Sequence, residues 1–310
     1  MRDLTKGTCM LLIGILILFS TVPFVSSESL TINSDQQLAY ARGLMEEGEY
    51  ELAITELERF IHFFPESNEV PAAQNLIGIC YLRERKYEKA RDSFSGTIRS
   101  NPGSSFAGKA LFMTGETYYE QGVPAEAEHY FLEVLKQYPT PEMKNAVRYR
   151  LGWTWMKEDR WKDASEAFSK VEAGSPFYES ASVLTKESLK GELLPRKDPV
   201  TAGVMAGLLP GLGHVYASRY KDALVAFLLN GLFIWATVES FHQDHNVLGG
   251  ILGFLEVGWY TGNIYSAVNV THKYNRKIRD DFRNGLMDQM DFRLLSAGKR
   301  PAGLVLTFSF

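Results

Sequence analysis

Residues Thr201 to Tyr216 have the sequence TAGVMAGLLPGLGHVY, an uncharged, glycine-rich run in which Pro210 and Gly211 interrupt an otherwise apolar segment. Upstream of this run the sequence is acidic and regularly repeated, whereas downstream it contains apolar segments of membrane-spanning length. The run therefore divides the chain into two halves with different predicted folds, a soluble helical array and a membrane-embedded helical domain.

The overall composition limits the class of protein. A chain of 310 residues that is 45% hydrophobic and 13% aromatic is long enough for two modest domains and is not a mainly disordered protein. The formal net charge is -4. Basic residues are neither numerous nor interleaved with stacking aromatic residues, so nothing in the sequence indicates a nucleic-acid partner.

A repeat organises the acidic half, because residues of the same kind recur every 37 positions. Small residues near the middle of one helix and the start of the next allow two antiparallel helices to approach closely, aromatic residues fill the space between pairs, and a proline ends each second helix. An earlier, less regular copy keeps Ala41, Leu44 and Pro65, which gives four predicted repeats between about Ser34 and Phe177. The recurring columns are Gly78, Gly115 and Gly152; Tyr81, Tyr118 and Trp155; Tyr87, Pro124 and Trp161; Ala90, Ala127 and Ala164; Phe94, Phe131 and Phe168; and Pro102, Pro139 and Pro176.

This pattern resembles the tetratricopeptide repeat (TPR), lengthened by three residues as in periplasmic members of that family, and the resemblance covers about half of the chain. It implies a curved helical solenoid with a concave groove that captures a peptide or a partner helix. Tyr178 to Lys190 is expected to form the closing helix. The alternative for Phe112, Tyr149 and Trp153 is that they pack between repeats. In the family's register the groove residues are Arg42, Asn75, Arg83, Phe112, Glu116, Tyr119, Tyr149, Trp153 and Lys157, together with Leu38, Met45 and Ile79.

The N-terminal residues 1–27 have the features of a secretory signal. Arg2 and Lys6 precede an apolar run from Met10 to Phe19, and small residues suited to cleavage lie just before Glu28. We therefore expect the array to be exported to the periplasm. After cleavage Cys80 is the only cysteine, so no intramolecular disulfide is possible, and we expect it to be a buried helix residue.

Three apolar stretches follow a proline-containing linker at residues 191–199. Val200 to Ala217 carries no Asp, Glu, Lys or Arg, Ala223 to Val238 is nearly all apolar, and Val247 to Val270 carries one charge, Glu256. Their lengths predict two or three membrane-spanning helices in a short bundle within residues 200–270. This half would hold the protein in the bacterial inner membrane.

The distribution of basic residues favours three spans over two. If Thr201 to Tyr216 crosses the membrane, Arg219, Lys221 and the basic residues 272–279 face the cytoplasm, in accord with the positive-inside tendency. We therefore expect a helix kinked at Pro210 rather than a re-entrant loop, although neighbouring helices could satisfy the backbone of either form.

Glycines recur at helical spacing in the apolar half, at residues 203, 207 and 211, at 249 and 253, and at 258 and 262. Such spacing allows close helix packing or a homo-oligomer formed through the membrane helices. The PGLGHVY portion resembles a Pro-Gly-x-Gly-Gln-x-Tyr motif of small, uncharacterised bacterial membrane domains, for which no activity is established. The motif residues here are Pro210, Gly211, Gly213, His214 and Tyr216, and His214 replaces the usual glutamine.

Glu256 is the residue that most suggests chemistry, because a charged carboxylate is costly inside a membrane unless it is paired or hydrated. His214, Asn230 or Asn263 could pair with it. A proton path is one interpretation, and a neutral, hydrogen-bonded structural residue is the favoured one. His242, Asp244 and His245 favour a solvated turn over a weak metal site. The sequence contains no nucleotide-binding loop or nucleophile motif, so we predict no enzyme activity, no cofactor and no metal.

The basic tail, residues 271–310, ends with alternating large and small side chains at Leu304, Leu306, Phe308 and Phe310, which indicates a β-strand. A local β-hairpin, with Phe292 and Leu294 in its other strand, is favoured over a terminal barrel strand, because one strand cannot close a barrel.

The predicted fold is therefore all-α: a TPR solenoid of four 37-residue repeats plus a closing helix (residues 28–190), a transmembrane helical bundle and a small C-terminal β-hairpin. The predicted function is that of a non-enzymatic, membrane-tethered adaptor that binds protein partners in the assembly or maintenance of the cell envelope. The alternative is a small-solute or proton-conducting membrane protein in which the array is a regulatory domain.

Overall fold

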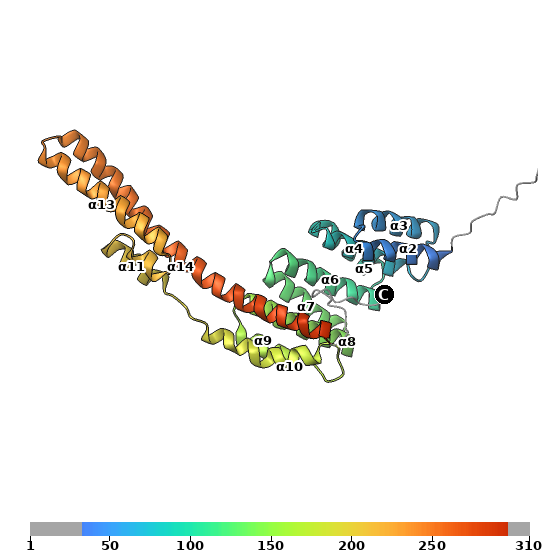
Figure 1. The fold of residues 1–310 in the computed structure, drawn as a ribbon. Helices are drawn as coiled ribbons and strands as arrows, with labels where there is room; N and C mark the ends of the chain where they lie inside the picture. Colours follow the sequence, from blue (N-terminus) through green and yellow to red (C-terminus); the bar gives the residue numbers. More distant parts are fainter. Residues whose placement is uncertain (1–32, 297–310) are drawn as a thin grey trace, which may run out of the picture. The chain divides into compact units, whose positions relative to one another are not determined.

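The computed structural model describes residues 33–296, with side chains up to residue 290. The predicted signal segment, and Leu304 to Phe310 of the predicted hairpin, lie outside the described residues. Contacts divide the chain after Ser67 into two compact units. In the first unit, α2 (Ser34–Glu47) and α3 (Tyr50–Phe63) form an antiparallel pair (Figure 1).

The described part of the second unit is entirely helical and begins with the remaining predicted repeats (Figure 1). Prolines, serine and threonine begin several of these helices, as expected for N-terminal positions. Its helices are α4 (Val70–Arg83), α5 (Tyr87–Ser100), α6 (Ser105–Gln121), α7 (Pro124–Gln137), α8 (Pro141–Lys157), α9 (Trp161–Ser169), α10 (Tyr178–Glu187), the 3-10 helix η1 (Ser188–Leu193), α11 (Pro199–Leu208), α12 (Leu212–Tyr216), α13 (Tyr220–His242) and α14 (Asn246–Ser296).

The helix pairs confirm the predicted repeats, and they show why the glycine column and the phenylalanine column recur together. Each column glycine lies directly beneath a column phenylalanine from the following helix, so a side chain at the glycine would collide with the ring. The ring therefore fills the space that the missing side chain leaves, and this contact sets the distance between the two helices. An added Cβ would lie 2.4 Å from Phe94 at Gly78, 2.7 Å from Phe131 at Gly115 and 2.5 Å from Phe168 at Gly152.

A second periodic feature lies in the turn between the two helices of each pair. Gly48, Arg85, Gly122 and Asp159 occupy equivalent positions, and all four have positive φ values of 84°, 59°, 84° and 61°. Glycine adopts this left-handed conformation without a steric penalty, whereas arginine and aspartate do not. The sequence shows no sign of this column, because only two of its members are glycine.

Thr201 to Tyr216 forms a helical hairpin rather than the expected kinked span. After α11 the chain turns at Pro210 and Gly211 and returns through α12. The two ends of the hairpin meet: the Asp198 N–H donates to the Tyr216 hydroxyl at 3.0 Å, and Lys197 Nζ lies 2.7 Å from Ser218 Oγ. The segment therefore enters and leaves on the same side of this helical unit.

Two glycines of the PGLGHVY motif make this hairpin possible. An added Cβ at Gly213 would lie 2.2 Å from the Ala202 carbonyl oxygen. Gly211 has a φ of 89°, and its added Cβ would lie 2.4 Å from the Ala223 carbonyl oxygen. Both positions need the backbone to approach another backbone more closely than any side chain allows.

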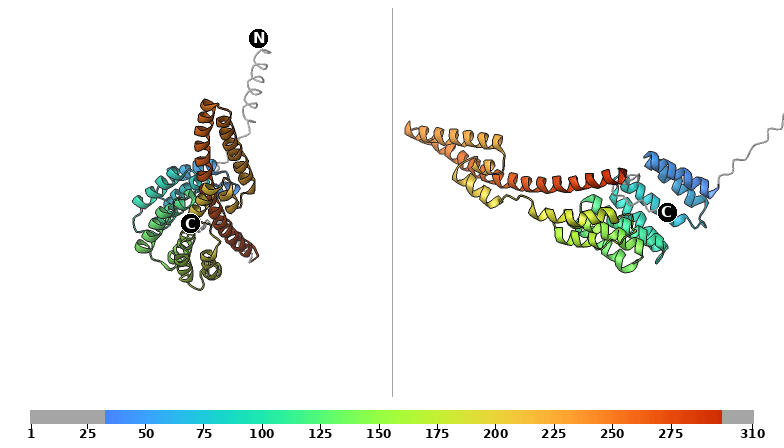
Figure 2. Two further views of the ribbon diagram at one scale, coloured as in Figure 1. Left: turned by 90° about the vertical axis from the view of Figure 1, so that its left-hand side faces the viewer. Right: turned by 60° about the horizontal axis from the view of Figure 1, so that its bottom comes forward.

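Helices α13 and α14 lie side by side over the length of α13, as Figures 1 and 2 both show. Within the described residues α13 is the one helix long and apolar enough to cross a membrane, by length and composition, and 11% of its most apolar window is buried. At about 1.5 Å per residue, its 23 residues would span about 35 Å. α11, the first arm of the hairpin, is also apolar but has only 10 residues.

The prediction for the tail is wrong where the structure describes it. α14 continues for 51 residues, through the boundary expected at residue 270 and as far as Ser296. Phe292 and Leu294, placed in a β-strand by the sequence pattern, lie in this helix. The basic segment from residue 271 onward is therefore a helical extension of the apolar half, and its contacts determine the candidate site.

Candidate partner-binding surface and polar cavity

The aromatic residues predicted to line the groove are packed inside the array. The Phe112 and Phe131 ring centroids lie 5.2 Å apart, and Phe112 has no exposed surface. Tyr149 and Trp153 both pack on Phe168, at centroid distances of 5.7 and 6.1 Å. These three predicted groove residues therefore occupy the positions that the alternative interpretation gave them, between helices.

Among the polar groove residues, Asn75 is buried and its Nδ2 donates to the Phe106 carbonyl oxygen at 3.0 Å. Arg42 in the first unit is half-buried, and Arg83 at the end of α4 is exposed. Asn75 therefore has a structural role in joining α4 to the next repeat, whereas the Arg83 side chain is accessible to solvent.

Glu116 on α6 forms a buried ion pair that the sequence analysis missed. Arg150 on α8 donates to both Glu116 carboxylate oxygens at 2.5 Å, and neither side chain is more than 2% exposed. Burial raises the pKa of Glu116 to about 7, despite the lowering effect of Arg150. Glu116 is thus engaged inside the array and does not face a free groove.

Tyr119 and Lys157 extend this polar group to the ends of α6 and α8. The Arg150 guanidinium lies 4.2 Å and Lys157 Nζ 3.4 Å from the Tyr119 ring centroid. Lys157 Nζ also donates to the Tyr119 carbonyl oxygen at 2.9 Å. Burial raises the pKa of Tyr119 to about 12 and lowers that of Lys157 to about 8. Of the predicted groove residues, Tyr119 and Lys157 lie closest to the contact with α14 described next.

The distal half of α14 docks at the end of α8. Arg283 Nη1 donates to the carbonyl oxygens of Met156 at 3.0 Å and Lys157 at 3.4 Å, and lies 3.2 Å from an Asp159 carboxylate oxygen. Arg279 also pairs with Asp159, at 3.0 Å. Carbonyl groups in the last turn of a helix lack intrahelical partners and attract cations, so this end of α8 suits an arginine.

Apolar contacts accompany these polar ones. The Phe282 ring packs edge-on against Trp161 at a centroid distance of 5.7 Å. Leu286 and Met290 are buried and belong to the same hydrophobic core as Tyr119, Met156 and other array residues. The end of the predicted groove formed by Tyr119 and Lys157 is therefore in contact with this chain's own helix.

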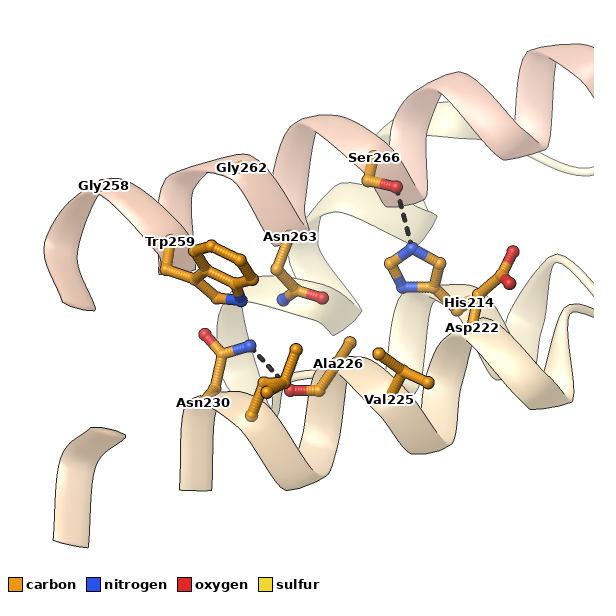
Figure 3. A pocket seen from close by; sticks show the side chains of 11 residues that line it. His214, Asp222, Val225, Ala226, Asn230, Gly258, Trp259, Gly262, Asn263 and Ser266 are labelled. Atoms are coloured by element: carbon orange, nitrogen blue, oxygen red, sulfur yellow. Dashed lines mark hydrogen bonds between the residues drawn. The ribbon is translucent and has the colours of Figure 1, made fainter. Parts of the chain in front are cut away.

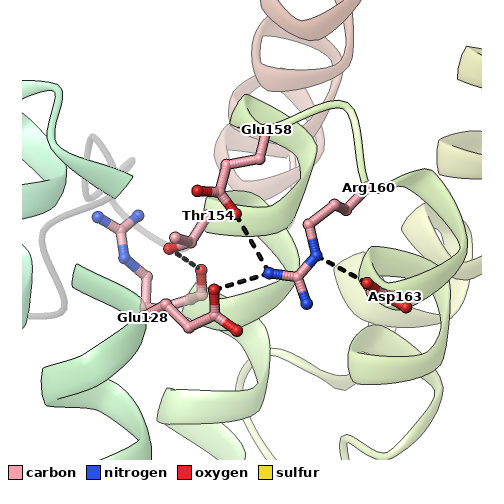
Figure 4. Close-up of polar contacts among 6 residues, drawn as sticks. Glu128, Thr154, Glu158, Arg160 and Asp163 are labelled. Carbon is pink, nitrogen blue, oxygen red and sulfur yellow. Dashed lines mark hydrogen bonds and ion pairs between the residues drawn. The ribbon is translucent and has the colours of Figure 1, made fainter. Parts of the chain in front are cut away.

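A second polar cluster holds consecutive helices of the array together. Arg160 at the start of α9 bonds to Glu128 at 2.7 Å, Glu158 at 3.2 Å and Asp163 at 2.7 Å (Figure 4). These three carboxylates hold the pKa of Arg160 above its usual value. The cluster joins α7, the α8–α9 turn and α9, and so fixes the turn that presents Asp159 to α14.

A cavity of about 510 Å³ lies between α12, α13 and α14 and contains the buried motif residue His214 (Figure 3). His214 Nε2 lies 3.0 Å from Ser266 Oγ. Asn230 Nδ2 donates to the Ala226 carbonyl oxygen at 2.6 Å, and Asn263 Nδ2 to that of Ala206 at 3.2 Å. Among the described residues nothing bonds to His214 Nδ1 or to either asparagine Oδ1.

Glu256 lies on α14 and is mostly buried, but it does not pair with any of the three partners considered for it. Neither of its carboxylate oxygens has a hydrogen-bond partner among the described residues. The loop residues His242, Asp244 and His245 are exposed, and the described part of the chain contains no group of three or more potential metal ligands. The cavity offers hydrogen-bonding groups, among them the pair formed by Ser266 Oγ and His214 Nε2.

Comparison with known proteins bears on the array. No curated protein matches the chain. Among solved structures it is similar to a tetratricopeptide repeat protein from Parabacteroides merdae, with 14% identity, a TM-score of 0.40, and coverage of 77% of this chain and 98% of that one. PilF from Pseudomonas aeruginosa shows 17% identity, a TM-score of 0.37, and coverage of 72% and 89%. Two models of the tetratricopeptide repeat match residues 38–105 and 109–141. The matched part of the array, within residues 38–141, is therefore built of tetratricopeptide repeats, which form scaffolds for protein–protein interaction.

Proposed function

We propose that this protein is a non-enzymatic, membrane-tethered adaptor that binds protein partners in the bacterial cell envelope. The observation that carries this proposal is the attachment of a TPR array to a pair of helices with exposed apolar faces. Along α13 large apolar side chains point away from the protein, and a lipid environment would cover them. Among these are Leu224, Leu228 and Trp235, each more than half exposed.

In the proposed topology α13 and the first half of α14 cross the membrane as a hairpin, and the α11–α12 hairpin enters the membrane and returns. Arg283 contacts the carbonyl groups of Met156 and Lys157, and two groups in contact cannot lie on opposite sides of a bilayer. The array and the distal half of α14 therefore share one side, which the predicted signal makes the periplasm.

This topology departs from the positive-inside tendency, because it places the basic residues 272–279 outside the cytoplasm. Direct contacts outweigh that tendency here. The α11–α12 hairpin has its two ends joined through Asp198 and Tyr216, and Arg279 pairs with Asp159 of the array. The first contact requires an even number of crossings between residues 198 and 216, and the second requires an even number between the array and the distal half of α14.

Cysteine labelling tests the topology. Single cysteines replace Gln243, in the α13–α14 turn, and Gln289, on the exposed face of distal α14. A membrane-impermeant maleimide applied to spheroplasts should label position 289, and position 243 only after the inner membrane is permeabilised. Labelling of position 243 but not 289 would contradict the topology, and release of the protein by alkaline carbonate would contradict membrane tethering altogether.

The adaptor role is tested by photo-crosslinking in living cells. A photoreactive residue at Arg83, the exposed position among the predicted groove residues, should give a discrete crosslinked protein band. The matched control is Leu132, an exposed residue on α7, a second helix of its repeat. Absence of any Arg83-specific band in cells that express the protein at its natural level would contradict the adaptor proposal.

The second candidate function, conduction of protons or a small solute, is favoured by one specific observation. The buried carboxylate of Glu256 and the unpartnered polar atoms of His214, Asn230 and Asn263 lie in the apolar half of the protein. Protein reconstituted into vesicles should then carry a proton flux that Glu256→Gln abolishes. Equal flux from the wild type and from Glu256→Gln would remove the support for this function.

A further inference from the structure

We propose that the array carries a helix-binding surface, formed by the end of α8, Asp159 and Trp161, and that residues 279–290 of α14 are its built-in occupant. A partner that presents an amphipathic helix with the same pattern would bind there by displacing this segment. The inference goes beyond the adaptor role and does not depend on the membrane topology.

The occupant has the pattern of a groove-binding helix. Phe282, Leu286 and Met290 are spaced four residues apart, so they lie along one face of α14. Leu286 and Met290 are 5% and 2% exposed, and Phe282 packs on Trp161. On the opposite face Asn284 and Asp288 are exposed. One face of the segment therefore binds the array and the other is solvated.

The polar contacts fix the direction and register of the bound helix. Arg283 reaches the Met156 and Lys157 carbonyl oxygens and Asp159, while Arg279, one turn earlier, also pairs with Asp159. A helix bound in the reverse direction, or shifted by one residue, would lose these contacts. The surface therefore selects a helix that carries an arginine next to its first apolar anchor and a second arginine one turn before it.

Gly285 suggests that the segment is suited to displacement. It lies in the middle of the docked turns, and an added Cβ would meet no atom within 4 Å. Packing therefore does not require glycine at this position, and glycine is the weakest helix former after proline. The residue lowers the intrinsic stability of the helix where it binds, and Gly285→Ala should strengthen docking without changing any contact.

A competition experiment tests the proposal with the full-length protein in detergent. The probe is a fluorescent peptide of residues 278–292, followed by fluorescence anisotropy. The wild type should bind it weakly, because the tethered segment competes at high effective concentration. Phe282→Ala/Leu286→Ala, which weakens docking from the α14 side only, should bind the peptide at least ~10-fold more tightly. The matched control, Asn284→Ala/Asp288→Ala on the solvated face, should behave as the wild type.

The array side of the contact is tested by Asp159→Gly in the Phe282→Ala/Leu286→Ala background. Glycine suits the positive φ of this position, so the substitution removes the carboxylate without disturbing the turn. Affinity for the peptide should fall ~5-fold, and a peptide that carries both Arg279→Ala and Arg283→Ala should be insensitive to the change. Unchanged affinity for the unmodified peptide would overturn the proposed surface.

Gly285→Ala provides a second test, which can be made even if the Phe282→Ala/Leu286→Ala variant does not fold. This substitution should lower the affinity of the full-length protein for the peptide by ~4-fold relative to the wild type, because it stabilises the docked competitor. Equal affinity of Gly285→Ala and the wild type would overturn the idea of a displaceable occupant. Equal affinity of Phe282→Ala/Leu286→Ala and the wild type, with unchanged helical circular dichroism, would do the same. If the Phe282→Ala/Leu286→Ala variant forms dimers without the peptide, as light scattering would show, the partner is a second copy of this chain. That outcome would overturn the proposal that a different protein binds the surface.

Discussion

At the scale of single residues, the equivalent turn positions Gly48, Arg85, Gly122 and Asp159 share one backbone conformation, but their side chains have different roles. All four residues adopt the left-handed backbone conformation, which costs a non-glycine residue about 1–2 kcal/mol. The Arg85 side chain is exposed and the structure gives no reason for its strained backbone. Asp159 has the same strain, but its carboxylate binds Arg279 and Arg283. In the fourth repeat the contact between Asp159 and the two arginines offsets the cost of the left-handed backbone. In the second repeat no such contact within the described residues offsets this cost at Arg85.

Arg85→Gly should therefore stabilise the protein by about 0.5–1 kcal/mol, since relief of backbone strain exceeds the added entropy of the unfolded chain. Urea unfolding followed by circular dichroism measures this change. Gly122→Ala, at the equivalent position with a φ of 84°, should destabilise by about 1 kcal/mol and serves as the reverse control. A lower unfolding midpoint for Arg85→Gly would show that its side chain has a role that the structure does not reveal.

The buried Glu116 predicts a specific pH dependence of stability. Its pKa is raised from 4.5 to about 7 in the folded state, so between these values the folded protein binds the proton more tightly than the unfolded chain does. The contribution of Glu116 to stability is therefore fully present below pH 4.5 and is lost as the pH rises through about 7. Glu116→Gln should flatten the fall in the free energy of unfolding across this window. Glu120→Gln, an exposed neighbour on the same helix, should keep the fall, and a similar slope in all three proteins would contradict this assignment.

At the scale of elements, the hairpin of α11 and α12 depends on two backbone approaches that only glycine permits. Gly213 lies against the Ala202 carbonyl group and Gly211 against that of Ala223. Gly207 is different, because it has ordinary van der Waals space, with Ile264 at 3.6 Å from an added Cβ. The regular spacing of residues 203, 207 and 211 in the sequence therefore hides two different roles, and the essential pair is 211 and 213.

Gly213→Ala should destabilise the apolar half by about 2–3 kcal/mol, since the added methyl group would overlap a carbonyl oxygen and the backbone must move. Gly207→Ala, the matched control, should be neutral or slightly stabilising because alanine is the better helix former. Thermal unfolding in detergent, followed by circular dichroism, compares the two. Equal unfolding temperatures for both variants would contradict the tight contact at residue 213.

At the scale of the whole molecule, the sequence predicted the helix pairs well, because their period is local and each column has a packing reason. It failed for the tail, since a change from apolar to basic composition after residue 270 does not end a helix; α14 continues through it. The Arg150 partner of Glu116 and the Asp159 partner of Arg283 come from residues 34 and 124 positions away. Periodicity identifies which residues share a face but not which distant segment covers that face, so the docking of α14 could not be predicted.

The contact between α14 and the array predicts crosslinking across more than 100 residues of sequence in intact cells. Cysteines at Asp159 and Arg283, whose side chains lie 3.2 Å apart, should be joined by an impermeant bismaleimide to give a looped chain with altered mobility on denaturing gels. Cys80 should not interfere, because burial raises its pKa to about 12 and keeps it as an unreactive thiol. A pair at Asp159 and Gln243, the far end of the α13–α14 hairpin, is the control and should stay unlinked. Looping of the control pair, or none of the first pair in protein whose single cysteines both react, would show that the array and α14 do not meet in the cell. That result would remove the physical link between the apolar half of the molecule and the array.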